Sequence, residues 1–177
     1  MEAIEALKIR RSCRSFTDEQ VKKEDLQTII DCGLNAPSGS NRQDTKIIVV
    51  ESEDKIRKLS KMNASVANMK VDPFYGAKTV CLIVGPKDSG YKEEAFQLNP
   101  VKNGSLVIGA MQTAAFSINV GSCWINCCKE MLDLPEGQEI LEELGLIDYQ
   151  GVGCCVLGYP NKTVVVKKIK EGRVIYY

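Results

Sequence analysis

The sequence predicts a single α+β domain, a sheet of three or four strands flanked by helices. The chain has 177 residues, enough for one domain with a sizeable core. Hydrophobic residues make up 44% of it and charged residues 26%, which is typical of globular proteins. Segments of helical periodicity are interspersed with short β-branched runs, and no repeat or linker divides them. We therefore expect residues 1–177 to form one layered domain.

Five segments place apolar residues at helical spacing. They are residues 2–9, 23–35, 53–61, 104–120 and 136–144. The longest, 104–120, is apolar or small on nearly every face, which predicts burial all round and, in a domain of this size, contact with a second subunit. Gly121 is expected to end this helix. Pro37 is expected to end the helix predicted at residues 23–35.

Strands are predicted where β-branched residues cluster between turn residues. The expected strands are 46–50, 79–84 and 149–157, with a basic strand near the C-terminus in 163–168 and 173–177. Residues 62–77 are expected to be a loop with a helical turn, and residues 87–98 a polar, exposed segment.

Charge and hydropathy exclude several classes of partner. Lys plus Arg and Asp plus Glu both total 23, so the net charge is zero, which argues against nucleic acid or an anionic membrane as the main partner. No apolar run reaches the roughly 18 residues of a membrane span. The N-terminus carries Glu2 and Glu5 without an apolar signal region, so a cytoplasmic protein is expected.

The chain has eight cysteines and no histidine. Two pairs of cysteines are adjacent and several lie in apolar runs, which is typical of reduced, buried thiols and not of a disulfide framework. The absence of histidine excludes Ser-His and Cys-His nucleophiles and any imidazole acid or base. A metal site is not expected, and an enzyme of this sequence would depend on a cofactor or on carboxylates.

The stretch Arg10-Arg11-Ser12-Cys13-Arg14 places three guanidiniums and a hydroxyl within five residues. Arginine forks match the oxygens of phosphate, and a nearby serine adds a further hydrogen bond. In a chain of zero net charge, this local cluster indicates a local anion. The alternative for Arg14 is a surface ion pair.

Five motifs, in order along the chain, resemble the nitroreductase family of flavin enzymes, in its short branch without long insertions. They are Arg10-Arg11-Ser12-x-Arg14-x-Phe16, Ala36-Pro37-Ser38-Gly39-x-Asn41-x-Gln43, Asp72-Pro73-Phe74-Tyr75-Gly76-Ala77, Gly121-Ser122-Cys123-Trp124-Ile125, and Gly151-x-Gly153 with Gly158-Tyr159-Pro160. Each motif is weak alone, and the ordered set is specific.

The resemblance implies FMN bound at a homodimer interface, with each site drawing on both chains. It implies hydride transfer from NADH or NADPH and a ping-pong transfer of electrons to nitroaromatics, quinones or similar small acceptors. The implied fold is a mixed sheet flanked by helices, with the long apolar helix in the dimer interface and the C-terminus reaching across the partner.

By position in the first motif, Arg10 and Ser12 resemble the phosphate and ribityl ligands, and Arg11 belongs to the same set. Arg14 resembles the cation beside the N1–C2 carbonyl edge of the flavin. Reduction places negative charge at that edge, so a fixed cation there favours the reduced cofactor.

The remaining site residues come from four other segments. Pro37, Ser38, Gly39 and Asn41 resemble the loop that contacts FMN from the other subunit, with Gly39 standing where many members have Ser. Ser122, Cys123, Trp124, Ile125 and Asn126 resemble the segment beside the ring near N5, although Trp124 also suits a core aromatic. Lys167 or Lys168 resembles a second phosphate cation, and Asn63 another flavin-edge ligand. Asp44-Thr45 replaces the Pro-Trp that often follows the loop.

Two other functions remain open from the sequence. One is a flavin-binding sensor or carrier without turnover, in which NAD(P)H would not bleach the bound FMN. The other is a metal or thiol-redox protein that uses Cys123, Cys127 and Cys128.

Overall fold

The computed structural model describes residues 2–162 and 168–177. In chain order the elements are α1 (Ala3–Ile9), α2 (Lys23–Leu34), the 3-10 turn η1 (Gly39–Asn41), β1 (Lys46–Val50), α3 (Glu53–Val66), β2 (Thr79–Pro86), the 3-10 turn η2 (Glu94–Phe96), α4 (Asn99–Ser117), β3 (Gly121–Ile125), α5 (Cys128–Leu132), α6 (Pro135–Glu143) and β4 (Tyr149–Gly158). The predicted α+β class is confirmed.

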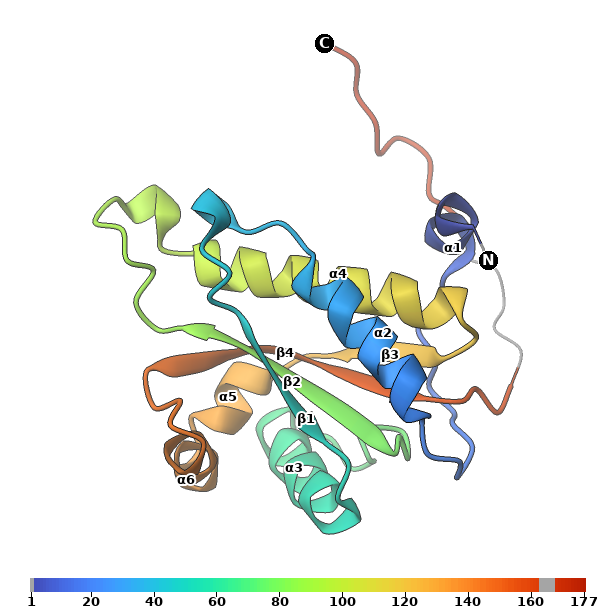
Figure 1. Ribbon diagram of the computed structural model, residues 1–177, viewed down its shortest axis with the longest axis horizontal. Helices are drawn as coiled ribbons and strands as arrows, with labels where there is room; N and C mark the ends of the chain where they lie inside the picture. The colour runs from blue at the N-terminus through green and yellow to red at the C-terminus, as the bar shows by residue number, and fades with distance from the viewer. Residues whose placement is uncertain (1, 163–167) are drawn as a thin grey trace.

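The four strands form one sheet in the order β1-β2-β4-β3. All three pairings between these strands are antiparallel, so the described part of the chain lacks the parallel pair of a mixed sheet. Strands β2 and β4 occupy the centre, and β1 and β3 are the edges. The sheet is flanked by helices on both faces, as expected (Figure 1).

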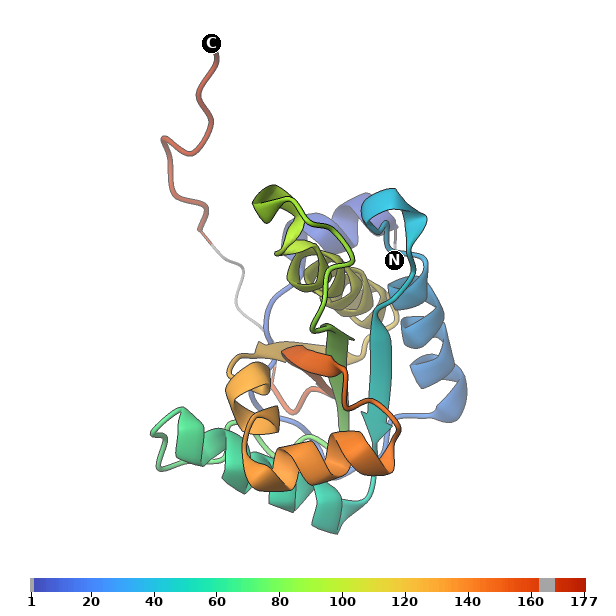
Figure 2. The same ribbon diagram turned by 90° about the vertical axis from the view of Figure 1, so that its left-hand side faces the viewer.

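Alternation along β2 divides the core into two clusters. Val80, Leu82 and Val84 belong to the cluster shared with α3, α5 and α6, whereas Cys81 and Ile83 belong to the cluster shared with α2 and α4. Figure 1 and Figure 2 show the resulting three layers, with α2 and α4 above the sheet and α3, α5 and α6 below it. Because both faces of β2 are covered, the strand is buried from Thr79 to Gly85.

Glycines in β4 allow neighbouring elements to approach its backbone. A Cβ at Gly151 would lie 2.5 Å from the carbonyl carbon and oxygen of Cys128 at the start of α5. A Cβ at Gly153 would lie 2.9 Å from side-chain atoms of Ile108 and Trp124. Between these glycines the register with β2 shifts at Val152, which packs against Gly104 of α4. These glycines therefore set the distance between the sheet and both helical layers.

The longest predicted helix is present, but its boundaries were wrong. Helix α4 begins at Asn99, with Pro100 in its first turn, where proline is tolerated because that N–H needs no partner. It ends at Ser117 because Asn119 adopts a left-handed φ of 63°. The amide of Val120 then donates to the Ala115 carbonyl at 2.8 Å, which closes the helix before Gly121 is reached.

Strand β3 and helix α5 were not predicted, and the expected C-terminal strand is not supported. The motif Gly121–Ile125 is the edge strand β3, and α5 follows it. Of the expected C-terminal strand, residues 163–167 lie outside the described residues, and residues 168–177 contain no strand. This segment projects from the body in Figures 1 and 2, and Ile175 and Tyr176 are 89% and 94% exposed. A strand needs a neighbour for its backbone hydrogen bonds, and no described residue supplies one.

The cysteines are free, and six of the eight are buried. Burial raises the pKa of Cys81 from its ordinary 9.0 to about 12, and it also raises the pKa of Cys155. The pKa of Cys154 is raised by its hydrogen bond with Cys128 and by burial. The prediction of reduced, apolar core thiols is confirmed, because ionisation of these groups inside the core is strongly disfavoured.

No helix among the described residues is long and apolar enough to cross a membrane.

Replacement of Gly151 by Ala should destabilise the protein more than replacement of Gly153 by Ala. The new methyl at position 151 meets the backbone of α5, which cannot rotate away, whereas at position 153 it meets side-chain ends. We expect a loss of about 1–3 kcal/mol in the free energy of unfolding for Gly151→Ala and a smaller loss for Gly153→Ala, measured by urea denaturation. Equal losses would contradict this account of the α5 contact.

The buried thiols should make the protein less stable in alkali. A thiol with a raised pKa in the fold ionises first in the unfolded chain, so its contribution is complete below pH 9 and is lost as pH rises toward 12. For each such thiol the free energy of unfolding should fall by about 1.4 kcal/mol per pH unit above pH 9.

Urea denaturation of the reduced protein at fixed concentration, from pH 8 to pH 11, measures this slope. The variant Cys81→Ala should show a shallower fall than the wild type, even if it starts from a lower stability. Parallel slopes would show that Cys81 does not contribute to the alkaline loss.

Candidate functional site

The structure brings together the first and fourth sequence motifs at the edge strand β3. After α1 the chain runs beside this strand, and the amide of Cys13 donates to the Ser122 carbonyl at 2.8 Å. Gly121 permits the approach, because a Cβ there would lie 2.9 Å from the Cys13 side chain. The segment containing Arg10, Ser12 and Arg14 is therefore held against the segment Ser122–Asn126.

The three guanidiniums of the first motif have different environments. The Nη1 of Arg10 is buried and has no hydrogen-bond partner within the described chain. Arg11 folds back on α1, where its Nη1 donates to the carbonyls of Arg10 and Lys8. Arg14 is exposed and makes no ion pair with any carboxylate in residues 2–162 or 168–177, so the alternative of a surface ion pair is not supported.

Unpartnered donors of this kind indicate an acceptor that is not part of the folded chain. A buried polar group without a partner costs about 1–3 kcal/mol, and more when it is charged. Ser122 adds a second such group, since its residue is 2% exposed and its Oγ has no partner among the described residues. A guanidinium and a hydroxyl at one strand edge suit an anion with a polar tail.

Cys123 lies within the field of this cationic cluster. Burial raises the pKa of its thiol, while the Arg14 guanidinium and a hydrogen bond with Ser12 lower it in part. The net direction is upward, so the neutral thiol is favoured. Arg14 and Ser12 are thereby placed close to the Cys123 side chain.

Trp124 packs over the backbone of Gly153 and against Ile108 of α4, and it is half-buried in the cluster shared with α2 and α4. This contact agrees with its interpretation as a core aromatic. Ile125 is buried on the opposite face of the sheet, in the other cluster. The side chains of both residues thus contribute to holding β3 on the sheet.

Asn63 positions the end of β3. Its side chain is 1% exposed, and Nδ2 donates to the Asn126 carbonyl at 2.8 Å. The next residue, Cys127, has a left-handed φ of 59°, so this bond secures the turn into α5. Asn126 itself is exposed at the surface beside this turn.

The second motif lies away from the first, at the other end of α4. The amide of Gly39 donates to Asn103 Oδ1 at 3.0 Å in the first turns of that helix, whereas α1 lies beside the other end (Figure 1). Arg10 lines a hollow with Thr113, about 15 Å further along α4 at 1.5 Å per residue. Ser38, Gly39 and Asn41 are therefore not gathered with Arg10 and Arg14 in one chain.

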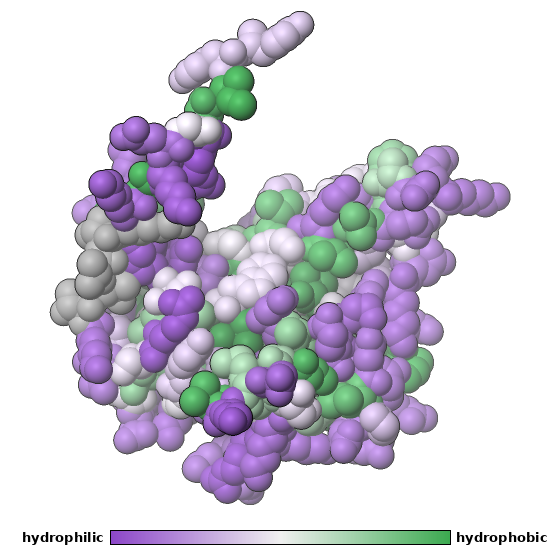
Figure 3. Space-filling model, turned by 180° about the vertical axis from the view of Figure 1, so that it is seen from behind, coloured by the Kyte–Doolittle hydropathy of each residue, from purple (hydrophilic) through white to green (hydrophobic). Residues whose placement is uncertain are grey.

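Pro37 is the residue of the second motif that lies near Arg10 of the first motif. It lines the same hollow of about 800 Å³ as Arg10, along the flank of α4 that carries Leu106 and Gly109. Leu106 is 49% exposed, and Leu7 of α1, also in the hollow, is 66% exposed. Seen from behind, hydrophobic side chains gather across the middle of the surface between hydrophilic lobes (Figure 3).

The C-terminal cations are not part of this arrangement in the described chain. Lys167 lies outside the described residues, and Lys168 is exposed. The prediction that one of them binds phosphate remains a prediction.

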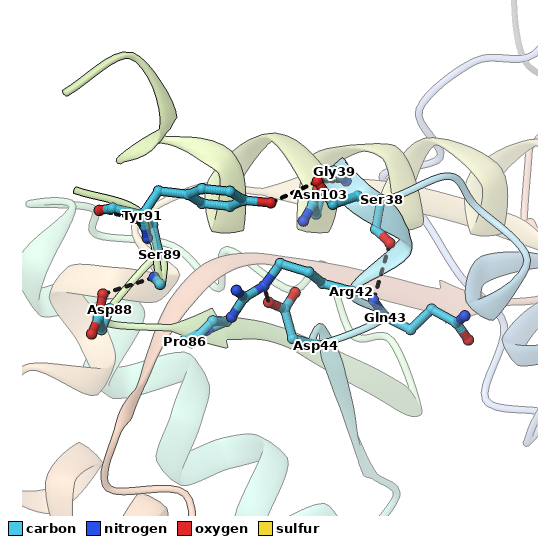
Figure 4. A network of polar contacts seen from close by, with 12 residues as sticks. Ser38, Gly39, Arg42, Gln43, Asp44, Pro86, Asp88, Ser89, Tyr91 and Asn103 are labelled. Carbon is cyan, nitrogen blue, oxygen red and sulfur yellow. Dashed lines mark hydrogen bonds and ion pairs between the residues drawn. The ribbon is translucent and has the colours of Figure 1, made fainter. Parts of the chain in front are cut away.

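Three residues that sequence analysis did not single out support the second motif: Arg42, Tyr91 and Asn103. Arg42 pairs with Asp44, with 2.7 Å between Nε and Oδ2, and Tyr91 donates its hydroxyl to Ser40 Oγ at 2.7 Å (Figure 4). The only sequence feature that could have drawn attention to Tyr91 is that it is an aromatic residue after a glycine in a polar segment. Within residues 2–162 and 168–177, no cluster of three His, Cys, Asp or Glu side chains suits a metal ion.

Comparisons with known proteins agree on one family. The nitroreductase family model matches residues 7–159. A protein of Archaeoglobus fulgidus, provisionally named NADH dehydrogenase/NAD(P)H nitroreductase, is 26% identical over 154 residues, which cover 82% of this chain and 84% of that protein. The NADPH-flavin oxidoreductase of Vibrio harveyi is 25% identical over 194 aligned residues, which cover 98% of this chain and 72% of that protein.

Solved structures resemble the whole fold. A nitroreductase with bound FMN from Bacteroides fragilis NCTC 9343 superposes with a TM-score of 0.85 and 25% identity, over 100% of this chain and 99% of that one. An FMN-dependent nitroreductase of Clostridium difficile R20291 gives a TM-score of 0.78 and 26% identity, over 98% of both chains. Since the family model also matches most of the sequence, from α1 to the end of β4, the chain belongs to the nitroreductase family.

Proposed function

We propose that this protein is an FMN-dependent oxidoreductase that takes hydride from NADH or NADPH and reduces nitroaromatics, quinones or similar small acceptors by a ping-pong route. The observation that carries the proposal is that Nη1 of Arg10 is buried and has no hydrogen-bond partner among the described residues. Its segment is the first of five motifs that match the family in order, and one related structure contains bound FMN while another is of an FMN-dependent nitroreductase.

The residues at the edge of β3 fit FMN in chemistry. Arg10 offers an unsatisfied donor for the phosphate, and Ser12 and Ser122 offer hydroxyls for the ribityl chain. Arg14 offers a cation without a carboxylate partner among the described residues, which suits the ring edge that becomes negative on reduction. Bound FMN would supply the two-electron chemistry that links NAD(P)H to the acceptor.

The protein's own contribution is binding, orientation and charge. Arg10 and Ser12 would hold the phosphate and ribityl end of FMN, which would restrict the positions open to its ring. Arg14 stabilises negative charge at the ring edge without a proton transfer. The chain has no histidine, so no imidazole can supply the protons that the acceptor requires, and these would come from water or from the reduced flavin.

A homodimer with two sites at its interface accommodates the second motif. The loop Ser38–Asn41 lies apart from Arg10 within one chain, and the flank of α4 with Leu106 and Gly109 borders an open hollow. Pairing of two chains along this flank covers the apolar side chains and lets the loop of one chain meet the Arg10 cluster of the other.

Thiol chemistry is the less favoured alternative. Cys123 and Cys128 are buried, and burial raises the pKa of the Cys123 and Cys127 thiols, which lowers the fraction of reactive thiolate. The carrier alternative is separated from the enzyme by one observation: bleaching of the visible flavin absorbance when NADH or NADPH is added without oxygen supports an enzyme.

Arg10→Ala should weaken FMN binding by roughly 10- to 100-fold, the range expected for loss of a charge-assisted hydrogen bond. Titration of the apoprotein with FMN, followed by flavin fluorescence, measures the dissociation constant. Arg57→Ala is the matched control, because Arg57 pairs with Glu53 on the exposed face of α3 and should leave FMN affinity unchanged. Equal affinity of wild type and Arg10→Ala would remove Arg10 from the phosphate site.

Arg14→Ala should lower the flavin reduction potential and slow reduction by NAD(P)H even with FMN saturating. Loss of the cation removes on the order of 1–3 kcal/mol of stabilisation from the reduced form. For a two-electron couple, about 1.4 kcal/mol corresponds to roughly 30 mV. A redox titration measures the shift, and Arg14→Lys, which retains the charge, should keep most of the potential. An unchanged potential with weaker FMN binding would make Arg14 a phosphate ligand or a scaffold residue.

A further inference from the structure

The loop Ser38–Gln43 has an unfavourable backbone conformation. Ser40, Asn41 and Gln43 have φ values of 53°, 54° and 51°, in the left-handed region that residues with a Cβ rarely adopt. Such conformations persist when the surroundings determine them, and they cluster at functional sites. Something outside the loop must therefore hold it.

Two parts of the chain hold the loop from outside. Asn103 of α4 accepts the Gly39 amide at 3.0 Å, and Tyr91 donates its hydroxyl to Ser40 Oγ at 2.7 Å (Figure 4). Within the loop, the Gln43 amide donates to Ser38 Oγ at 3.0 Å. Asn103 is 5% exposed in a regular helix, so it is a rigid support. Tyr91 comes from the segment 87–98, which the sequence predicted to be only polar and exposed.

That segment is built to hold Tyr91 in place. Ser89 at its centre is 2% exposed, and its Oγ accepts the Tyr91 amide at 3.2 Å. Gln97 Nε2 donates to the Tyr91 carbonyl at 2.6 Å, and the ring of Phe96 lies 5.1 Å from the Tyr91 ring, centre to centre. The backbone amide, the backbone carbonyl and the ring of Tyr91 thus each have a contact within the segment.

Arg42 adds a second contact between the loop and Tyr91. Its guanidinium carbon lies 5.6 Å from the centre of the Tyr91 ring, within the range of a cation–π interaction. Gly90 leaves room for this guanidinium, because a Cβ there would lie 2.5 Å from Arg42 Nη1. Arg42 also pairs with Asp44, which lies two residues before β1.

We propose that Tyr91 is a positioning residue, which presets the Ser38–Gln43 loop for contact with FMN through its bond to Ser40 and its contact with Arg42. This inference rests on the proposed function, in which the loop of one chain meets the cofactor of the other. The loop is preset before FMN arrives, so binding does not incur the cost of ordering it. Tyr91 itself need not touch the cofactor.

The test uses the full-length protein with the variants Tyr91→Phe, Ser40→Ala and the double variant. Tyr91→Phe removes only the hydroxyl, and Ser40→Ala removes the same bond from the loop side. Tyr149→Phe is the matched control, because the structure gives the Tyr149 hydroxyl no hydrogen-bond partner within the described residues.

Two quantities are measured. Hydrogen exchange of the apoprotein reports the Gly39 and Gln43 amides without any cofactor, and FMN titration reports the dissociation constant. In Tyr91→Phe we expect both amides to exchange about fivefold faster and the dissociation constant to rise about fivefold, the size of one ordinary hydrogen bond. Ser40→Ala should match it, and the double variant should lose no more than either single variant.

Any other outcome would contradict either the positioning role of Tyr91 or the proposed function. Unchanged exchange at Gly39 and Gln43, or an unchanged dissociation constant, would overturn the positioning role of Tyr91. Faster exchange spread over the core amides of β2 would also overturn it, because the effect would then be global. A wild-type protein that does not bind FMN would instead refute the proposed function itself, whatever the variants do.

Discussion

The antiparallel pairing of β2 with β4 is the interaction on which the rest of the molecule depends. Both strands are covered by helices on both faces, and β1, β3, α4 and α5 pack directly against them. Helices α1 and α2 pack in turn on α4, and α6 packs on α5. A strand buried on both sides requires apolar residues throughout, which explains the run from Val80 to Val84. It also requires small residues where a helix or ring comes close, which explains Gly151 and Gly153.

The candidate site uses the edge of this sheet because the edge offers unpaired backbone. Strand β3 pairs with β4 on one side only, and its other side receives Cys13 from the segment after α1. An edge strand left open is a liability for aggregation, and the cationic segment closes part of it. In the proposed function the same segment also supplies the cations of the FMN site. The unsatisfied donors of Arg10 and Ser122 are a cost to the folded chain that a bound anion would remove.

The two ends of α4 lie beside different parts of the candidate site. At one end Arg10 borders the hollow along α4, and at the other Asn103 and Tyr91 hold a loop with three left-handed residues. The long helix connects them as a stiff element of 19 residues. Two motifs that are separated in one chain can complete one site only when a second chain is added, so dimerisation would itself assemble the cofactor site.

The sequence by itself determined the local elements and the family. Helices α1 and α2 and strands β1, β2 and β4 follow from apolar spacing, which depends only on neighbours in the chain. The five ordered motifs were sufficient to indicate a nitroreductase, and the family model confirms that assignment. The Arg10–Arg14 cluster was likewise visible as a concentration of cations in a neutral chain.

Tertiary structure decided what depends on contacts between distant residues. Strand β3 is a strand because β4 pairs with it, and α4 ends at Ser117 because Asn119 turns left-handed. Only the folded structure shows which buried donors lack a partner, as with Arg10. Likewise, only the fold brings Tyr91 into contact with Ser40, 51 residues earlier in the chain. These features arise from packing and hydrogen bonds that no local pattern encodes, whereas helix and strand periodicity are written in consecutive residues.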